Sequence, residues 1–137
     1  MIVRAHSFLL DSEALSLLVA DDRSMQAWAT VARRTDSILY ASALTIAEVT
    51  DGSARDAEVR RAIKALRVVD VDDTIAYGAG RLRASGVRAR RKPRDMTVDA
   101  VVASTALLLP APVVVLTSDS EDFELLLEGE PVLVERV

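Results

Sequence analysis

Four acidic residues that lie far apart in the sequence are placed where their carboxylates could act together. Asp11 ends a short apolar stretch, and Asp119 lies two residues beyond the apolar run VVVLT (113–117). Glu48 and Asp99 lie within ALTIAEV and TVDAVVASTALLL, two mostly apolar segments with helical spacing. A carboxylate among apolar neighbours costs free energy unless a cation or a strong hydrogen bond compensates it. The four acids therefore indicate a shared cation site, although Asp99 could instead be a first-turn residue favoured by the helix dipole.

The composition narrows the chemistry that such a site could use. The 137 residues include no cysteine and one histidine, His6, which excludes thiolate nucleophiles and sulfur-ligated metals. A Ser–His–Asp triad or a multi-histidine zinc site would depend on His6 alone. Oxygen ligands without histidine or cysteine suit Mg²⁺ or Mn²⁺, which keep several waters and meet substrates through phosphate oxygens.

Short apolar runs alternate with amphipathic segments along the whole chain. We expect one α/β domain, residues 1–137, with a mainly parallel sheet, because parallel strands buried on both faces read as apolar runs. Ligands of such sheets collect beyond the carboxyl ends of the strands, where Asp11 and Asp119 lie. Strands are expected at 6–11, 37–41, 68–71, 113–117 and 131–137, and helices at 12–20, 25–34, 43–50, 53–67, 72–85, 96–109 and 120–128.

Three residues mark expected helix ends. Ser42 is placed to cap the helix that begins at Ala43, and Asp95 is placed to cap the helix that contains Asp99. Gly86 is expected to stop the helix before it.

The basic residues gather in one segment of a chain whose net charge is −4. Residues 81–94, RLRASGVRARRKPR, hold seven of the 17 basic residues and no acidic residue. This segment precedes the expected helix of Asp99, so its cationic side chains could lie beside the four acids at the carboxyl ends of the strands and bind a polyanion. A solvated loop is the alternative. The candidate contacts are Arg88, Arg90, Arg91, Lys92 and Arg94.

Nothing in the sequence indicates membrane insertion or secretion. No run approaches the roughly 20 apolar residues of a membrane span, and Asp11 interrupts the N-terminal apolar stretch too early for a signal peptide. We expect a soluble, cytoplasmic protein.

Four stretches, LLDSEALSLL, SALTIAEV, TVDAVVASTAL and VLTSDSEDF, resemble in this order the acidic motifs of PIN-domain ribonucleases, especially VapC toxins of bacterial toxin–antitoxin pairs. The resemblance implies a three-layer PIN-like fold, with helices on both faces of the sheet. It also implies Mg²⁺- or Mn²⁺-dependent endonucleolytic cleavage of an RNA substrate, inhibition by a cognate antitoxin protein, and a homodimer.

The resemblance also implies roles for individual residues. Asp11, Glu48, Asp99 and Asp119 correspond to the acidic quartet that holds the metal, and Asp122 resembles an additional acid found in some members. Thr117 matches a hydroxyl residue that helps to orient the cluster. The sequence departs from its relatives at Ser118, a position that is often basic or amide. Small polar residues that support the site correspond to Ser12 and Ser42.

Two other functions fit parts of the sequence. The chain could be a catalytically silent PIN-like module that binds RNA or a protein, although the intact quartet argues against it. A phosphoryl-accepting receiver domain would need paired acids after the first strand and a lysine after the last. The sequence offers Asp11, Ser12 and Glu13 at the first position and no lysine in PVLVERV.

Overall fold

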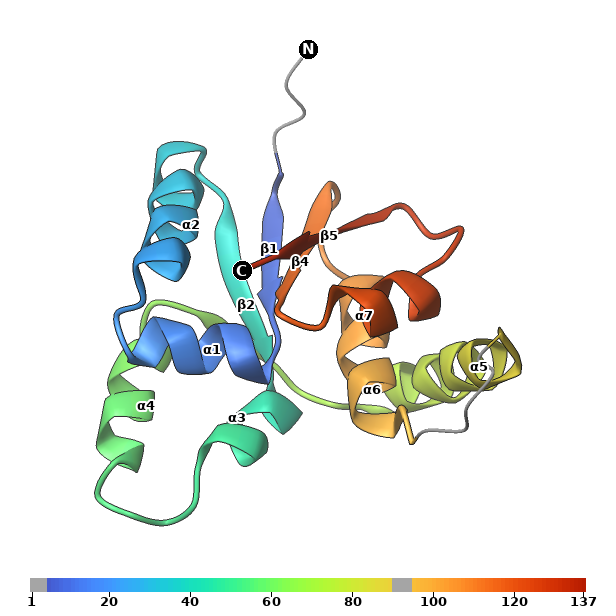
Figure 1. Ribbon diagram of the computed structural model, residues 1–137, viewed down its shortest axis with the longest axis horizontal. Helices are drawn as coiled ribbons and strands as arrows, with labels where there is room; N and C mark the ends of the chain where they lie inside the picture. Colours follow the sequence, from blue (N-terminus) through green and yellow to red (C-terminus); the bar gives the residue numbers. More distant parts are fainter. Residues whose placement is uncertain (1–4, 90–94) are drawn as a thin grey trace.

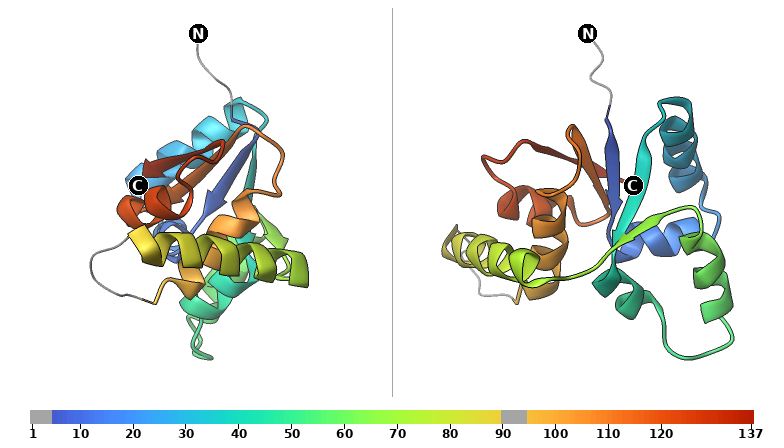
Figure 2. Two further views of the ribbon diagram at one scale, coloured as in Figure 1. Left: turned by 90° about the vertical axis from the view of Figure 1, so that its right-hand side faces the viewer. Right: turned by 180° about the vertical axis from the view of Figure 1, so that it is seen from behind.

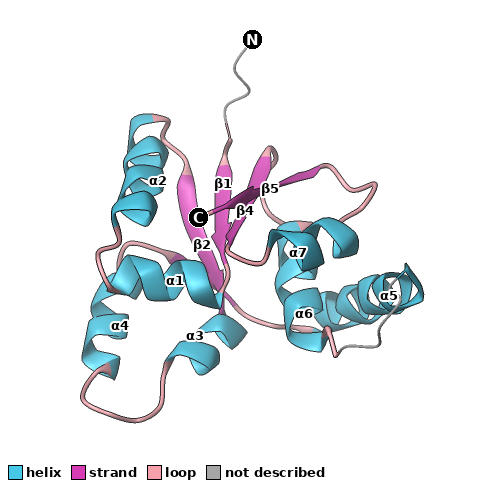
Figure 3. Cartoon of the chain, viewed as in Figure 1, coloured by secondary structure: helices cyan, strands magenta, loops and turns pink. Residues whose placement is uncertain are grey.

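A five-stranded parallel sheet forms the centre of the protein (Figures 1 and 3). The computed structural model describes residues 5–89 and 95–137, with backbone alone for 87–89. All four strand pairings are parallel, and the strand order is β3-β2-β1-β4-β5. The strands are β1 (Ser7–Leu10), β2 (Ile38–Ser42), β3 (Arg67–Val69), β4 (Val113–Thr117) and β5 (Val132–Arg136).

Helices cover both faces of this sheet and make a three-layer domain (Figure 2). On one face, Phe8 and Leu10 of β1 join a core with Met25 and Ala29. On the other face, Leu9 belongs to a second core. The alternation follows from the two-residue period of a strand, and β1 is buried along its length because both faces are covered. The helices are α1 (Ser12–Val19), α2 (Arg23–Arg34), α3 (Ala43–Val49), α4 (Asp56–Ile63), α5 (Asp73–Ala89), α6 (Thr97–Ala106) and α7 (Ser120–Leu126).

The connections create a topological switch point between two neighbouring strands. The chain winds outward from β1 through β2 to β3, then returns to lay β4 on the other side of β1. The strand order therefore reverses between β1 and β4, and such switch points are where open α/β sheets bind ligands, outside the carboxyl ends of the strands. Asp11 directly follows β1, and Asp119 follows β4 by two residues.

The helix-end predictions were only partly correct. Ser42 does cap α3, because its hydroxyl accepts a hydrogen bond from the Leu44 backbone N–H at 3.2 Å. Asp95 accepts a hydrogen bond from the Thr97 backbone N–H at 3.0 Å, but it is not the N-cap of α6. The N-cap is Met96, one residue later. Gly86 does not stop a helix, since α5 continues through it. A Cβ at this glycine would lie 3.1 Å from the Leu126 side chain, so the residue allows α5 and α7 to approach closely.

No helix in the two described ranges combines the length and apolarity that a membrane crossing requires.

Candidate functional site

Asp11 is fixed at the carboxyl end of β1 as the N-cap of α1. Its Oδ1 accepts the Ala14 backbone N–H at 2.8 Å, and its own backbone N–H donates to Leu116 in β4 at 3.2 Å. Only 7% of the residue is exposed. Burial raises the pKa of this carboxyl, and the nearby charge of Glu13 adds to the rise; the hydrogen bonds from Ala14 and Thr117 oppose it without cancelling it. The surroundings therefore disfavour the charged form of this carboxyl group.

Thr117 joins Asp11 to the loop that carries Asp119. This last residue of β4 is fully buried, and its Oγ1 donates to Asp11 Oδ2 at 2.5 Å. The same oxygen accepts the Asp119 backbone N–H at 2.9 Å. One hydroxyl thus sets the position of both acids at the switch point.

Three carboxylates meet beside this pair. Oxygen atoms of Asp99, Asp119 and Asp122 all lie within 4.8 Å of one another. Asp99 is in the first turn of α6, Asp119 immediately precedes α7, and Asp122 is in the first turn of α7 and only 2% exposed. Asp99 therefore is a first-turn residue, as the alternative expected, and it also belongs to the cluster.

Glu48 reaches the same space from α3. The residue is largely exposed at the surface, yet partial burial of its carboxyl group raises its pKa, and the negative charges of Asp99 and Asp11 raise it further. Both charges must be close to act in this way. Glu48 is therefore the residue whose electrostatics connect Asp11 with the three-carboxylate cluster.

The donor set fits a hard divalent cation. It consists of carboxylate oxygens only, which is the chemistry that Mg²⁺ and Mn²⁺ prefer. The pKa values of Asp11 and Glu48 are raised mainly by burial, and negative charges of neighbouring acids add to both shifts. A cation held by Asp99, Asp119 and Asp122 would place positive charge beside these carboxyl groups.

The predicted supporting serines lie in the segments that carry the acids. Ser42 is fully buried and caps the helix that carries Glu48. Ser12 is the first residue of α1 and is half-buried. Ser118 donates a hydrogen bond to the Glu13 carboxylate, a contact that the sequence did not predict. Thr45 was also missed; it lies three residues before Glu48, and this helical spacing was the signal that could have found it.

The side chains of the proposed basic contacts lie outside the part of the chain that the structure describes. For Arg88 the structure describes only the backbone, in the last turn of α5, and Arg90, Arg91, Lys92 and Arg94 lie outside the described residues. One described cation does lie close to the site: Arg55 lines a small hollow of about 190 Å³ together with Glu48.

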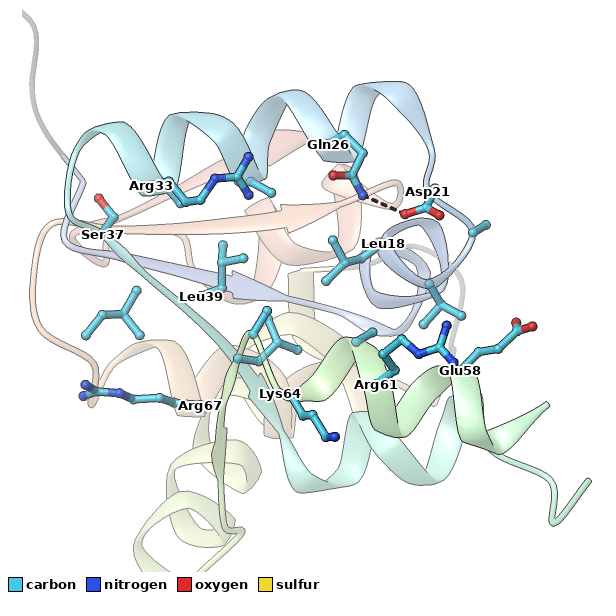
Figure 4. A pocket seen from close by; sticks show the side chains of 18 residues that line it. Leu18, Asp21, Gln26, Arg33, Ser37, Leu39, Glu58, Arg61, Lys64 and Arg67 are labelled. Carbon is cyan, nitrogen blue, oxygen red and sulfur yellow. Dashed lines mark hydrogen bonds between the residues drawn. The ribbon is translucent and has the colours of Figure 1, made fainter. Parts of the chain in front are cut away.

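A larger groove lies away from the acids, between α2 and α4 and over β2 (Figure 4). Its volume is about 830 Å³. The apolar lining includes Leu18, Ala29, Leu39 and Leu66. Its acidic members are Asp21, which accepts a hydrogen bond from Gln26 at 3.2 Å, and Glu58. Four cationic residues outnumber these acids and give the groove a positive balance: Arg33, Arg61, Lys64 and Arg67.

Comparison with known proteins identifies the fold. No protein-family model matches the sequence, and the search of curated proteins returns no significant match. Among solved structures, a chain of VapBC2 from Rickettsia felis, bound to a DNA fragment from the promoter, superposes with a TM-score of 0.73 at 11% identity. The alignment covers 96% of this chain and 98% of that one.

Two further structures give the same result. A chain of DNA-bound VapBC from Salmonella typhimurium has a TM-score of 0.66 and 21% identity, with 95% and 97% of the two chains covered. VapBC-5 from Mycobacterium tuberculosis, described as a toxin–antitoxin system, gives 0.57 and 24%, with 96% and 99% covered. The chain therefore has the PIN-like α/β fold expected from its sequence, over nearly its whole length.

Proposed function

We propose that this protein is a divalent-cation-dependent endoribonuclease and the toxin of a toxin–antitoxin pair, acting in the cytoplasm. The observation that supports this most directly is the meeting of the Asp99, Asp119 and Asp122 carboxylates within 4.8 Å at the sheet's switch point. Asp11 and Glu48 adjoin this group with raised pKa values. The fold is one that occurs in VapBC toxin–antitoxin complexes.

Each acid has a distinct task in this proposal. Asp99, Asp119 and Asp122 hold the cation, and Glu48 closes the site from α3. Asp11 is held rigidly by Thr117 and by the Ala14 N–H, so it needs no reorganisation when the site is loaded. When bound, Mg²⁺ or Mn²⁺ polarises the scissile phosphate and lowers the pKa of the attacking water.

We propose that basic side chains of the protein bind the RNA backbone beside the acids. Arg55 is placed for this role next to Glu48, and the segment that contains Arg90, Arg91 and Lys92 is a second candidate. Replacing Arg90, Arg91 and Lys92 with alanine should weaken RNA binding and flatten its salt dependence, because fewer counterions are released. Unchanged binding in a salt titration would remove that segment from the proposal.

The test of the enzymatic proposal compares single acid-to-amide variants on total RNA. Asp99→Asn and Asp119→Asn should abolish cleavage in Mg²⁺ and Mn²⁺, and EDTA should abolish it for the wild type. Glu121→Gln is the matched control, because Glu121 is exposed in the same first turn of α7 as Asp122 but outside the cluster. Cleavage that persists in EDTA or in Asp99→Asn would reject the mechanism.

The same variants separate catalysis from silent binding. Removing one carboxylate from the cluster should reduce the stabilisation that Mn²⁺ gives the wild type. RNA binding by the wild type without any cutting in either metal would instead favour a silent PIN-like module.

We propose that the groove between α2 and α4 receives a segment of the antitoxin. An apolar floor with an excess of cationic side chains fits an amphipathic helix that carries acidic residues beside its apolar face. The double charge reversal Arg33→Glu and Arg61→Glu should weaken such a complex about tenfold or more, while the exposed Arg23→Glu should not. Equal dissociation constants for both variants would exclude this groove. A homodimer is proposed as well, and light scattering of the free protein tests it.

A further inference from the structure

Thr45 has a buried hydroxyl that no described residue hydrogen-bonds. The residue is in α3 and is fully buried, and its Oγ1 has no hydrogen-bond partner among the described residues. Burying a hydroxyl in this way is unfavourable, and native proteins rarely retain such a group without a ligand, an ion or a water to satisfy it.

The local backbone explains why no partner is available within the helix. A helical threonine usually donates to the carbonyl four residues earlier, as Thr50 does to Ile46 at 2.7 Å and Thr105 does to Val101 at 2.8 Å. Four residues before Thr45 is Ala41, which belongs to β2 and precedes the helix. The hydroxyl does not bond the Ser42 carbonyl three residues earlier either, so we expect its partner outside α3.

The position of Thr45 suggests that its hydrogen-bond partner lies at the acidic cluster. Thr45 and Glu48 are three residues apart, so they lie on adjoining parts of one helix face. Helix α3 packs against α1, which Asp11 caps, and against α6, which contains Asp99. The pKa of Glu48 responds to both of these acids. Thr45 is thus buried one turn below a side chain that borders the cluster.

We propose that Thr45 is a positioning residue for the cation site and that its hydroxyl hydrogen-bonds to the hydration shell of a divalent cation held there. This rests on the cation site of the proposed function. Mg²⁺ and Mn²⁺ keep several waters when carboxylates bind them, and these waters need fixed partners on the protein. In this arrangement the hydroxyl is satisfied only when the cation is bound.

The test measures cation binding directly, without any assay of RNA cleavage. Mn²⁺ alone is titrated into the full chain by calorimetry, and thermal unfolding is recorded in chelator. Thr45→Val replaces the hydroxyl with a methyl group of the same shape, so it should weaken Mn²⁺ binding about tenfold or more. It should also leave the melting temperature in chelator equal or higher, because the unsatisfied hydroxyl is removed. Thr45→Ser should restore Mn²⁺ affinity.

Thr105→Val is the matched control, because Thr105 is equally buried but its hydroxyl has a partner. It should lower the melting temperature in chelator and leave Mn²⁺ affinity unchanged. The proposal is overturned if Thr45→Val binds Mn²⁺ as the wild type does, or if Thr45→Ser fails to restore a lost affinity. If the wild type binds no Mn²⁺, the cation site of the proposed function fails together with this inference.

Discussion

Replacing Thr117 with valine should destabilise the protein by more than the loss of an ordinary hydroxyl. Thr117 is fully buried and makes two hydrogen bonds, one to the Asp11 carboxylate at 2.5 Å and one from the Asp119 N–H at 2.9 Å. A hydrogen bond to a charged group contributes about 1.5–3 kcal/mol and a neutral one about 1 kcal/mol. We therefore expect Thr117→Val to lower the free energy of unfolding by about 2.5–4 kcal/mol at pH 7.

Thr117→Ser is the control, because it keeps the hydroxyl and removes one buried methyl group. Its cost should be about 1 kcal/mol. Urea unfolding at 25 °C in chelator, followed by circular dichroism, measures both variants. Equal losses for the serine and valine variants would show that packing, and not the hydrogen bonds, accounts for the effect.

The pH dependence of this variant provides a second check. The bond from Thr117 lowers the pKa of Asp11, so its loss raises that pKa further above the ordinary value. The charge-assisted part of the stabilisation exists only while Asp11 is ionised. The deficit of Thr117→Val relative to wild type should therefore shrink as the pH falls from 7 towards about 4, where carboxyl groups become protonated. A deficit that is constant over this range would refute the reasoning.

Two further predictions concern the wild-type charge cluster and the packing of α5. Because the folded-state pKa values of Asp11 and Glu48 are raised, the native state holds these protons more tightly than the unfolded chain, so their contribution to stability in EDTA should fall as pH rises from about 4 towards neutral. Asp51 and Asp95, whose pKa values are lowered, contribute in the opposite direction, so the fall is measured as the difference in melting temperature between the wild type and an Asp11→Asn, Glu48→Gln variant. Saturating Mn²⁺ should remove this fall; a difference that rises with pH in EDTA would contradict the assignment. Gly80→Ala should stabilise the protein by about 0.5–1 kcal/mol, because its Cβ meets nothing within 4 Å. Gly78→Ala in the same helix should destabilise it by about 1–3 kcal/mol, since its Cβ would clash with the buried Ser104 hydroxyl; equal urea midpoints would show that the helices adjust freely.

The sequence by itself determined the layered parallel fold and two of the acids at its ligand-binding edge. Apolar runs such as VVVLT can be buried on both faces only in a sheet covered by helices, and β4 is buried at every position. Asp11 and Asp119 follow strands that turned out to be neighbours, so their proximity follows from parallel pairing. The absence of cysteine and the single histidine likewise limited the candidate chemistry to oxygen ligands.

The sequence proposed that Glu48 and Asp99 join these two, but only the tertiary structure decided how the side chains meet. Glu121 and Asp122 are adjacent in the sequence, yet Asp122 is 2% exposed within the cluster and Glu121 is exposed, because the docking of α7 selects one face. The approach of Glu48 to Asp99 depends on α3 packing against α6 across about fifty residues of sequence, which local patterns do not encode. The unsatisfied hydroxyl of Thr45 is likewise visible only when every neighbouring donor and acceptor has been placed in three dimensions.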